Sequence, residues 1–145
     1  MKLENFWNFP RKYENIPVDI LKQQGMFLSE HTNNKLYGEV MVTPLSETVS
    51  VNKITFNIGS YHFVGFRYKL IEMEQKIGSD FPILIKMFTK SNGNIESTEK
   101  TVLTIEEFSD AVAEIIKNPI TQKIVNNIYW STIEFEKSLD EEEDD

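Results

Sequence analysis

Residues 82–98, PILIKMFTKSNGNIEST, decide the fold class of this chain. The first half, residues 82–89, is dense in Ile and Leu and typical of a strand, and its leading proline occupies the one strand position that tolerates it. Asn92-Gly93 follows, and Asn-Gly between β-prone residues predicts a type I′ hairpin because both residues accept positive φ. Residues 95–98 then return as a short edge strand, polar enough to resist pairing with another chain.

Upstream of this hairpin, apolar and polar residues alternate with a period of two, which predicts further strands. These strands cover residues 36–43, residues 51–61 and a segment that starts at residue 66. In the last of them the alternation slips at Leu70-Ile71, which indicates a β-bulge or a strand end buried on both faces. We therefore expect four or five strands that follow one another in a largely antiparallel meander.

A helix is predicted before the strands, over residues 17–31, where apolar residues recur at helical spacing behind a proline suited to the first turn. Gly25 lies in the middle of this segment. Glycine in a helix costs about 1 kcal/mol relative to alanine, so its presence indicates close packing against a neighbouring element.

Two helices are predicted after the strands. Thr104 and Glu107 form a capping box, in which Thr104 caps the helix and Glu107 reaches back, and Leu103 and Phe108 are spaced as a hydrophobic staple. Asn118-Pro119 ends this helix and begins the last one, which we expect to end near residue 137.

The order of helix, strands, helix, helix is typical of an α+β fold. We expect an N-terminal helix, a largely antiparallel four- to five-stranded sheet and two C-terminal helices packed on one face, because half-apolar strands need only one core. A chain of 145 residues fits one domain, here residues 1–137. Within it, residues 1–15 form an aromatic N-terminal arm, and residues 138–145 follow as a disordered acidic tail.

The net charge of −8 is concentrated at the C-terminus. The last six residues are all acidic, and the rest of the chain has 17 acidic residues against 15 basic ones. A nucleic-acid binder needs a concentrated basic surface, so nucleic-acid binding is not expected. The first ten residues lack the apolar run of a signal peptide and no segment is apolar enough to span a membrane, so we expect a cytoplasmic protein without membrane attachment.

The residue inventory leaves few routes to catalysis. Cysteine is absent, which excludes thiolate nucleophiles and cysteine-ligated metals. His31 and His62 are the only histidines, and His31 suits the C-terminal end of its helix. The six glycines are scattered and match no phosphate-binding loop. We therefore predict no catalytic residue, no metal and no cofactor, and the sequence favours a protein that is not an enzyme.

Two groups of residues are candidates for binding. The first is an aromatic cluster in the arm that either covers the core or meets a partner, since such residues are enriched at interfaces: Phe6, Trp7, Phe9 and Tyr13. The second combines aromatic and cationic residues that could contact an anionic ligand: Tyr61, His62, Arg67 and Lys69. For His62 and for the Arg67–Lys69 pair, a packed corner and a solvated strand face are the alternatives.

By exclusion, the sequence favours a small protein-binding module of the immunity, inhibitor, antitoxin or adaptor type, with a protein partner or self-association. The alternative is a small-molecule or nucleotide-binding domain, with a pocket between sheet and helices near His62. A binding module would act through the aromatic arm, and a pocket protein would be stabilised by its ligand.

Overall fold

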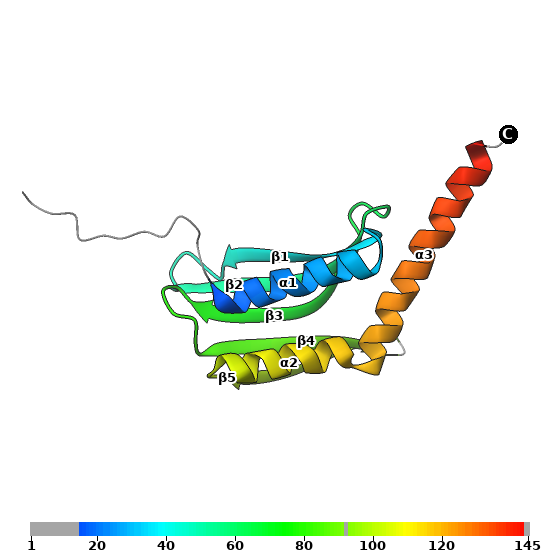
Figure 1. The fold of residues 1–145 in the computed structure, drawn as a ribbon. Coiled ribbons are helices and arrows are strands. Elements are labelled where there is room, and N and C mark those ends of the chain that lie inside the picture. Colours follow the sequence, from blue (N-terminus) through cyan, green and yellow to red (C-terminus); the bar gives the residue numbers. More distant parts are fainter. Residues whose placement is uncertain (1–14, 92, 144–145) are drawn as a thin grey trace, which may run out of the picture.

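The structure is a computed structural model that describes residues 15–91 and 93–143. Three helices and five strands follow one another in the expected order (Figure 1): α1 (Ile16–His31), β1 (Leu36–Pro44), β2 (Val51–Ser60), β3 (Tyr68–Lys76), β4 (Ile83–Ser91), β5 (Asn94–Val102), α2 (Ile105–Lys117) and α3 (Pro119–Glu143). The α+β class and the antiparallel sheet are therefore confirmed.

The five strands form one sheet in the order β1-β2-β3-β4-β5, with every neighbouring pair antiparallel. Ser91 faces Asn94 across the last pair, which leaves the two-residue connection that Asn-Gly predicted, and Gly93 has a φ of 82°. The expectation of a short last strand is wrong. Strand β5 extends to Val102 because each of its residues has a partner on β4.

The slip in the apolar pattern of β3 is a β-bulge. Phe56 of β2 pairs with Ile71 and the next residue, Asn57, pairs with Lys69, so Leu70 is the extra residue. Both Leu70 and Ile71 are buried. The bulge thus lets two consecutive apolar side chains leave solvent, which regular alternation would forbid.

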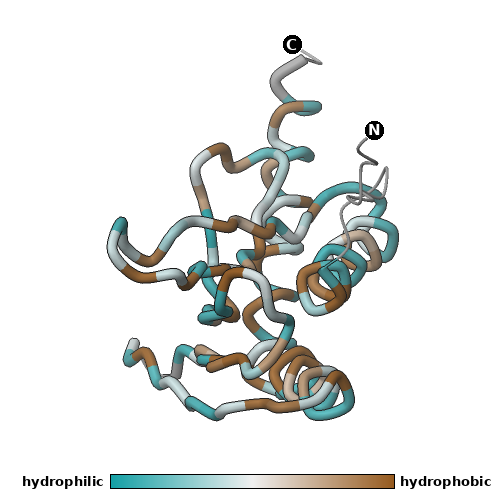
Figure 2. Tube along the Cα trace, turned by 90° about the vertical axis from the view of Figure 1, so that its left-hand side faces the viewer, coloured by the Kyte–Doolittle hydropathy of each residue, from teal (hydrophilic) through white to brown (hydrophobic). Residues whose placement is uncertain are grey.

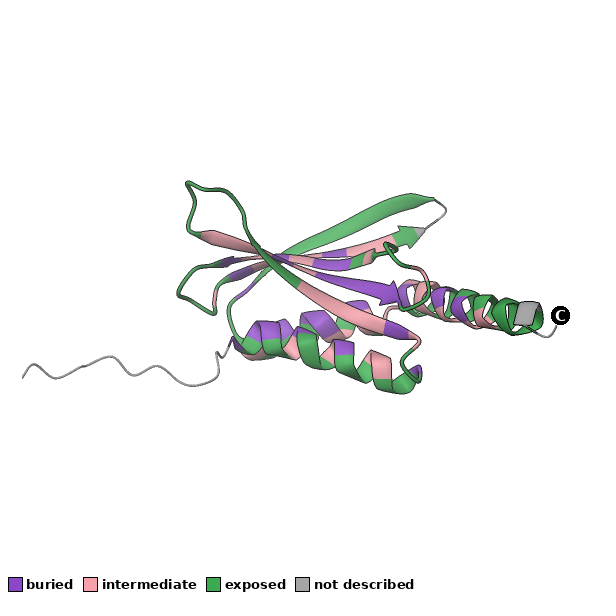
Figure 3. Ribbon diagram, turned by 90° about the horizontal axis from the view of Figure 1, so that it is seen from above, coloured by how far each residue is buried: buried purple, intermediate pink, exposed green. Residues whose placement is uncertain are grey.

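Helices α1 and α2 lie on the same side of the sheet (Figure 2) and bury their inner faces against it (Figure 3). The core between these layers is apolar. All five strands and all three helices contribute side chains to it, and β5 contributes only Val102 at its end. On the opposite face the sheet carries ion pairs, among them Lys53–Glu72 and Lys86–Glu99. One face therefore supplies the core and the other is polar, as expected for half-apolar strands.

Gly25 marks a direct approach of helix α1 to strand β1. A Cβ atom built at Gly25 would lie 2.8 Å from the carbonyl oxygen of Gly38, and one built at Gly38 would lie 2.6 Å from the Cα atom of Gly25. These contacts are with backbone, which cannot rotate away. The close packing predicted from this mid-helix glycine is confirmed.

The predicted caps begin helices α2 and α3. Thr104 Oγ1 accepts a hydrogen bond from Glu107 N, while Glu107 Oε2 accepts one from Leu103 N at 2.7 Å. The staple is incomplete, because Phe108 is buried but Leu103 is largely exposed. Asn118 Oδ1 accepts from Ile120 N at the start of α3.

The end of α3 differs from the sequence-based expectation. The helix does not stop near Lys137 but continues to Glu143, so residues 138–143, expected to be disordered, are helical. Helix propagation adds one hydrogen bond per residue once a turn exists, and this continues into the acidic run. In Figure 1, α3 crosses the end of the sheet and points away from the body.

Candidate functional site

Strands β3 and β4 pair along only part of their length. Their register runs from Ile71 opposite Met87 to Gln75 opposite Ile83. Beyond Ile71, residues 68–70 of β3 and 88–91 of β4 have no pairing with each other, although each segment still pairs with its other neighbour. The sheet therefore opens at the end that α3 crosses.

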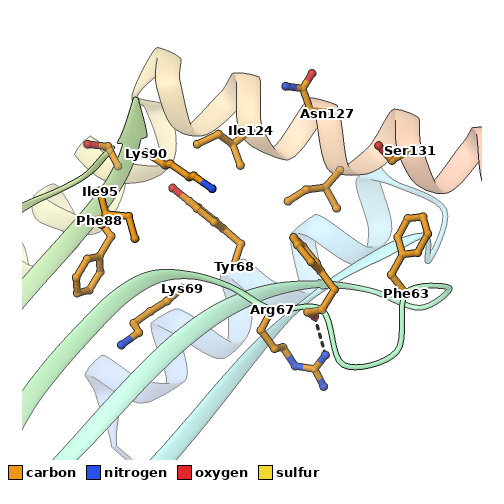
Figure 4. Close-up of a pocket in the computed structure, with 13 residues that line it drawn as sticks. Phe63, Arg67, Tyr68, Lys69, Phe88, Lys90, Ile95, Ile124, Asn127 and Ser131 are labelled. Carbon is orange, nitrogen blue, oxygen red and sulfur yellow. Dashed lines mark hydrogen bonds between the residues drawn. The ribbon is translucent and has the colours of Figure 1, made fainter. Parts of the chain in front are cut away.

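A cavity of about 750 Å³ occupies this opening (Figure 4). Its wall is mostly apolar and comes from the ends of three strands, from the loop that precedes β3 and from helix α3: Phe63, Phe66, Arg67, Tyr68, Lys69, Phe88, Thr89, Lys90, Ile95, Ile124, Asn127, Ile128 and Ser131. No Asp or Glu is among these residues. The cavity thus combines an aromatic and aliphatic wall with positive charge only.

Two of the three cations in the wall contact carboxylates outside it, although Lys69 shares its carboxylate, that of Glu72, with Lys53. Arg67 Nε lies 2.6 Å from Glu39 Oε2, and Lys69 Nζ lies 3.5 Å from Glu72 Oε1. Partial burial raises the pKa of Glu72, but hydrogen bonds and charge from Lys53 and Lys69 outweigh this and hold the pKa below its ordinary value. Glu72 is therefore ionised at neutral pH and fully able to pair with Lys69.

The third cation, Lys90, makes no ion pair within residues 15–91 and 93–143. Close to it, the buried hydroxyl oxygen of Tyr68 lacks a hydrogen-bond partner among the same residues. Burial raises the pKa of Tyr68, and a weak hydrogen-bonding contact from the Lys90 backbone to the oxygen, too poor in geometry to count as a bond, lowers it by a smaller amount. The O–H donor itself has no acceptor in the described part of the chain. The hydroxyl is therefore protonated at neutral pH and can donate.

Figure 4 shows how these groups face each other. The Tyr68 ring points from β3 toward α3, with Lys90 and Ile124 around its hydroxyl, while Phe88 and Lys69 lie farther from α3. The ammonium of Lys69 lies 5.3 Å from the centre of the Phe88 ring, a cation–π contact. Lys69 is thus held away from α3, and Tyr68 and Lys90 lie beside this helix.

Helix α3 is fixed over the cavity by polar contacts at its middle. Ser60 and Thr132 share a buried hydrogen bond, 2.8 Å between Oγ and Oγ1. The Glu136 carboxylate pairs with two side chains: its Oε2 lies 2.8 Å from Lys35 Nζ, and its Oε1 lies 2.6 Å from His62 Nε2. In the part of the chain described, this imidazole is the only partner of Oε1. These contacts set the position of the cavity wall that α3 provides.

The predicted ligand residues fall into two places. Arg67 and Lys69 line the cavity, as the sequence suggested for a cationic strand near aromatics. Tyr61 and His62 do not. Tyr61 packs on Tyr37, with ring centres 4.8 Å apart, and His62 pairs with α3. Both residues are exposed and lie outside the cavity, because the strand ends at Ser60 and the chain turns away there.

A second, smaller cavity of about 470 Å³ lies between the sheet and the helices. Helix α1 lines it with Phe27 and His31, and strand β3 lines it with Leu70. Helix α3 contributes Thr121 and Tyr129. A pocket in this layer was expected near His62, but the structure places it near His31. Helix α3 thus separates two cavities.

Sequence reasoning missed Tyr68 and Lys90, whose polar groups lack a side-chain partner within residues 15–91 and 93–143. Tyr68 was expected to point away from Arg67 and Lys69, and the predicted strand ended at residue 89, one position before Lys90. The only available signal was the slip at Leu70-Ile71 beside them, which marks where strand pairing changes. The other predicted set, Phe6, Trp7, Phe9 and Tyr13, lies outside the described residues.

Searches for other kinds of site gave negative results. Within the described residues, no three His, Asp or Glu side chains come together as metal ligands would. In the same part of the chain no helix combines the length and apolarity needed to cross a membrane. No family model, curated protein or solved structure matches this chain.

Proposed function

We propose that this chain is a binding protein for a small, largely apolar molecule, held in the cavity between β3, β4 and α3. The observation that carries this proposal is the cavity itself, about 750 Å³ in volume and walled mainly by aromatic and isoleucine side chains. Sites for small molecules have volumes in this range and combine an apolar wall with a few convergent polar groups.

Binding without catalysis fits the wall better than an enzyme does. The hydroxyls in the wall belong to Thr89, Ser131 and Tyr68, and the wall contains no histidine and no carboxylate. A hydroxyl nucleophile needs an adjacent general base. The proposal therefore develops the small-molecule alternative of the sequence analysis, and the protein-binding alternative stays a prediction that rests on the aromatic arm.

The test uses N-phenyl-1-naphthylamine, a neutral dye whose fluorescence rises in apolar surroundings. We expect saturable binding to the full chain with one site per molecule. Ile124→Trp should weaken it at least tenfold, because the side chain of Ile124 points into the cavity and a larger one would fill it (Figure 4).

The matched control is Lys123→Trp, since Lys123 is the exposed neighbour on α3 and lines neither cavity. Thermal melts of both variants establish that they fold. Equal dye binding by both variants and the wild type, or no saturable binding by the wild type, would remove the basis for the proposal.

A further inference from the structure

We infer that the ligand of this cavity is an amphipathic molecule with one carboxylate, and that Lys90 and Tyr68 recognise this group. The inference rests on the proposed function and adds the chemical class of the ligand. We draw this inference by comparing the polar groups of the wall that have a hydrogen-bond or ion-pair partner within the protein with those that have none.

The charged groups of the wall point to an anionic ligand. Arg67 is paired with Glu39, and Lys69 shares Glu72 with Lys53; both carboxylates lie outside the cavity. Lys90 alone has no carboxylate partner in the part of the chain described, and no acidic residue lines the cavity. A single anionic group on the ligand would give the exposed Lys90 ammonium the partner that it lacks.

The hydrogen-bonding groups specify a carboxylate. The buried O–H of Tyr68 has no acceptor within residues 15–91 and 93–143, and a buried donor of this kind costs free energy until it is satisfied. The hydroxyl and the Lys90 ammonium both donate, and the two oxygens of a carboxylate both accept. A carboxylate is therefore the smallest anionic group that satisfies both donors.

The rest of the wall determines the body of the ligand. Phe63, Phe66 and Phe88 with the isoleucines of α3 and β5 provide contact area without hydrogen-bonding demand. Burial of an apolar body contributes roughly 25 cal/mol per Å², so an alkyl or aryl chain supplies the binding energy while the carboxylate fixes its orientation.

The experiment compares three ten-carbon competitors that differ only in the head group: decanoate, decanol and decylammonium. Each displaces N-phenyl-1-naphthylamine from the full chain at neutral pH. A charge-assisted hydrogen bond is about twice as strong as a neutral one, so we expect decanoate to compete at a concentration about tenfold below that of decanol, and decylammonium to compete least.

Lys90→Met should abolish the preference of decanoate over decanol and leave decanol unchanged. Tyr68→Phe should reduce the preference several-fold. Lys100→Met is the matched control, because it also removes one surface ammonium, lies outside both cavities and pairs with Glu114. The control should keep the full preference.

The possible results separate the two proposals. If the dye binds but decanoate and decanol compete equally, or if Lys90→Met keeps the preference, the carboxylate inference is wrong and the apolar binding site stands. If the dye itself does not bind the wild type, both proposals fail.

Discussion

The boundary between the neighbouring strands β3 and β4, here called the seam, has two ends that are built from similar residues but pack differently. At one end Met73 faces Ile85, and both are completely buried in the core. At the other end Tyr68 and Phe88 belong to the same strands, yet these segments do not pair and the gap between them is a cavity. The paired end is therefore the stable part of the seam, and the open end is where the molecule has room for a ligand.

The difference between the ends arises from their neighbours. At the paired end the sheet is covered by α1 and α2, whose inner faces fill the space above it. At the open end the cover is α3, which crosses the strand ends and reaches them through a few side chains, such as Ile124 and Ile128. The Leu70 bulge lies at the transition, where it shifts the register between β2 and β3 by one residue.

The largest expected effect tests the paired end. Ile85→Ala removes a fully buried side chain and leaves a hole in the core, so we expect a loss of about 3 kcal/mol in the free energy of unfolding. Thr89→Ala, four residues along β4 and at the open end, should change it by no more than about 0.5 kcal/mol. Chemical denaturation measures both, and equal losses would mean that the two ends are equally well packed.

An intermediate effect tests how α3 is held at the open end. Thr132 Oγ1 donates to Ile128 O and accepts from Ser60, so Thr132→Val keeps the shape but leaves the buried Ser60 hydroxyl without an acceptor. We expect a loss of about 1.5 kcal/mol in the free energy of unfolding. The neighbouring exposed Ser131→Ala is the control and should be close to neutral.

If Thr132→Val also proves neutral in denaturation, α3 is held mainly by its apolar contacts. The dye titration adds a second measurement on this variant. A loosened α3 should weaken dye binding, because α3 forms one wall of the cavity.

The smallest effect is a dependence on pH at the same end. The hydrogen bond from Lys35 is the main cause that lowers the pKa of Glu136, partial desolvation opposes it and His62 adds to the lowering. A carboxyl whose pKa is lower in the folded chain stabilises the fold above its unfolded value, and this contribution is lost as the pH falls through the folded pKa. The contribution is therefore present at neutral pH and disappears below about pH 4.5.

The measurement is the melting temperature of wild type and Glu136→Gln from pH 7 to pH 3. The wild type should be slightly more stable at pH 7, and the two curves should converge in the acid range. A constant difference across this range would show that the carboxylate charge of Glu136 does not stabilise α3.

Much of the fold could be predicted because its signals are local. Asn92-Gly93 specifies a two-residue connection through the φ values that these residues accept. Thr104 and Asn118 specify helix starts through hydrogen bonds to residues two or three positions ahead. Gly25 indicated a close neighbour, although only the fold identified that neighbour as Gly38.

The end of α3 and the length of β5 were predicted wrongly because each depends on more than local composition. Strand β5 continues through polar residues since β4 offers a partner for each of them, and polarity alone suggested an earlier end. In the same way, the acidic run looked like a tail, but it continues a helix that is already formed and anchored at Glu136.

The sequence by itself determined the order of elements, the helix caps and the hairpin, because each depends on residues within a few positions of one another. The slip at Leu70-Ile71 left two alternatives open, and the pairing of β2 with β3 decided for the bulge. Only the tertiary structure decided where the cavity lies and which cation in it is free. Lys69 is paired because the bulge at Leu70 brings Glu72, three residues along the same strand, to its side, whereas Lys90 has no carboxylate partner within the described residues. The cavity is formed by strands about twenty residues apart and by a helix that follows a further thirty residues later. Such a juxtaposition depends on how whole elements pack, and local periodicity does not encode it.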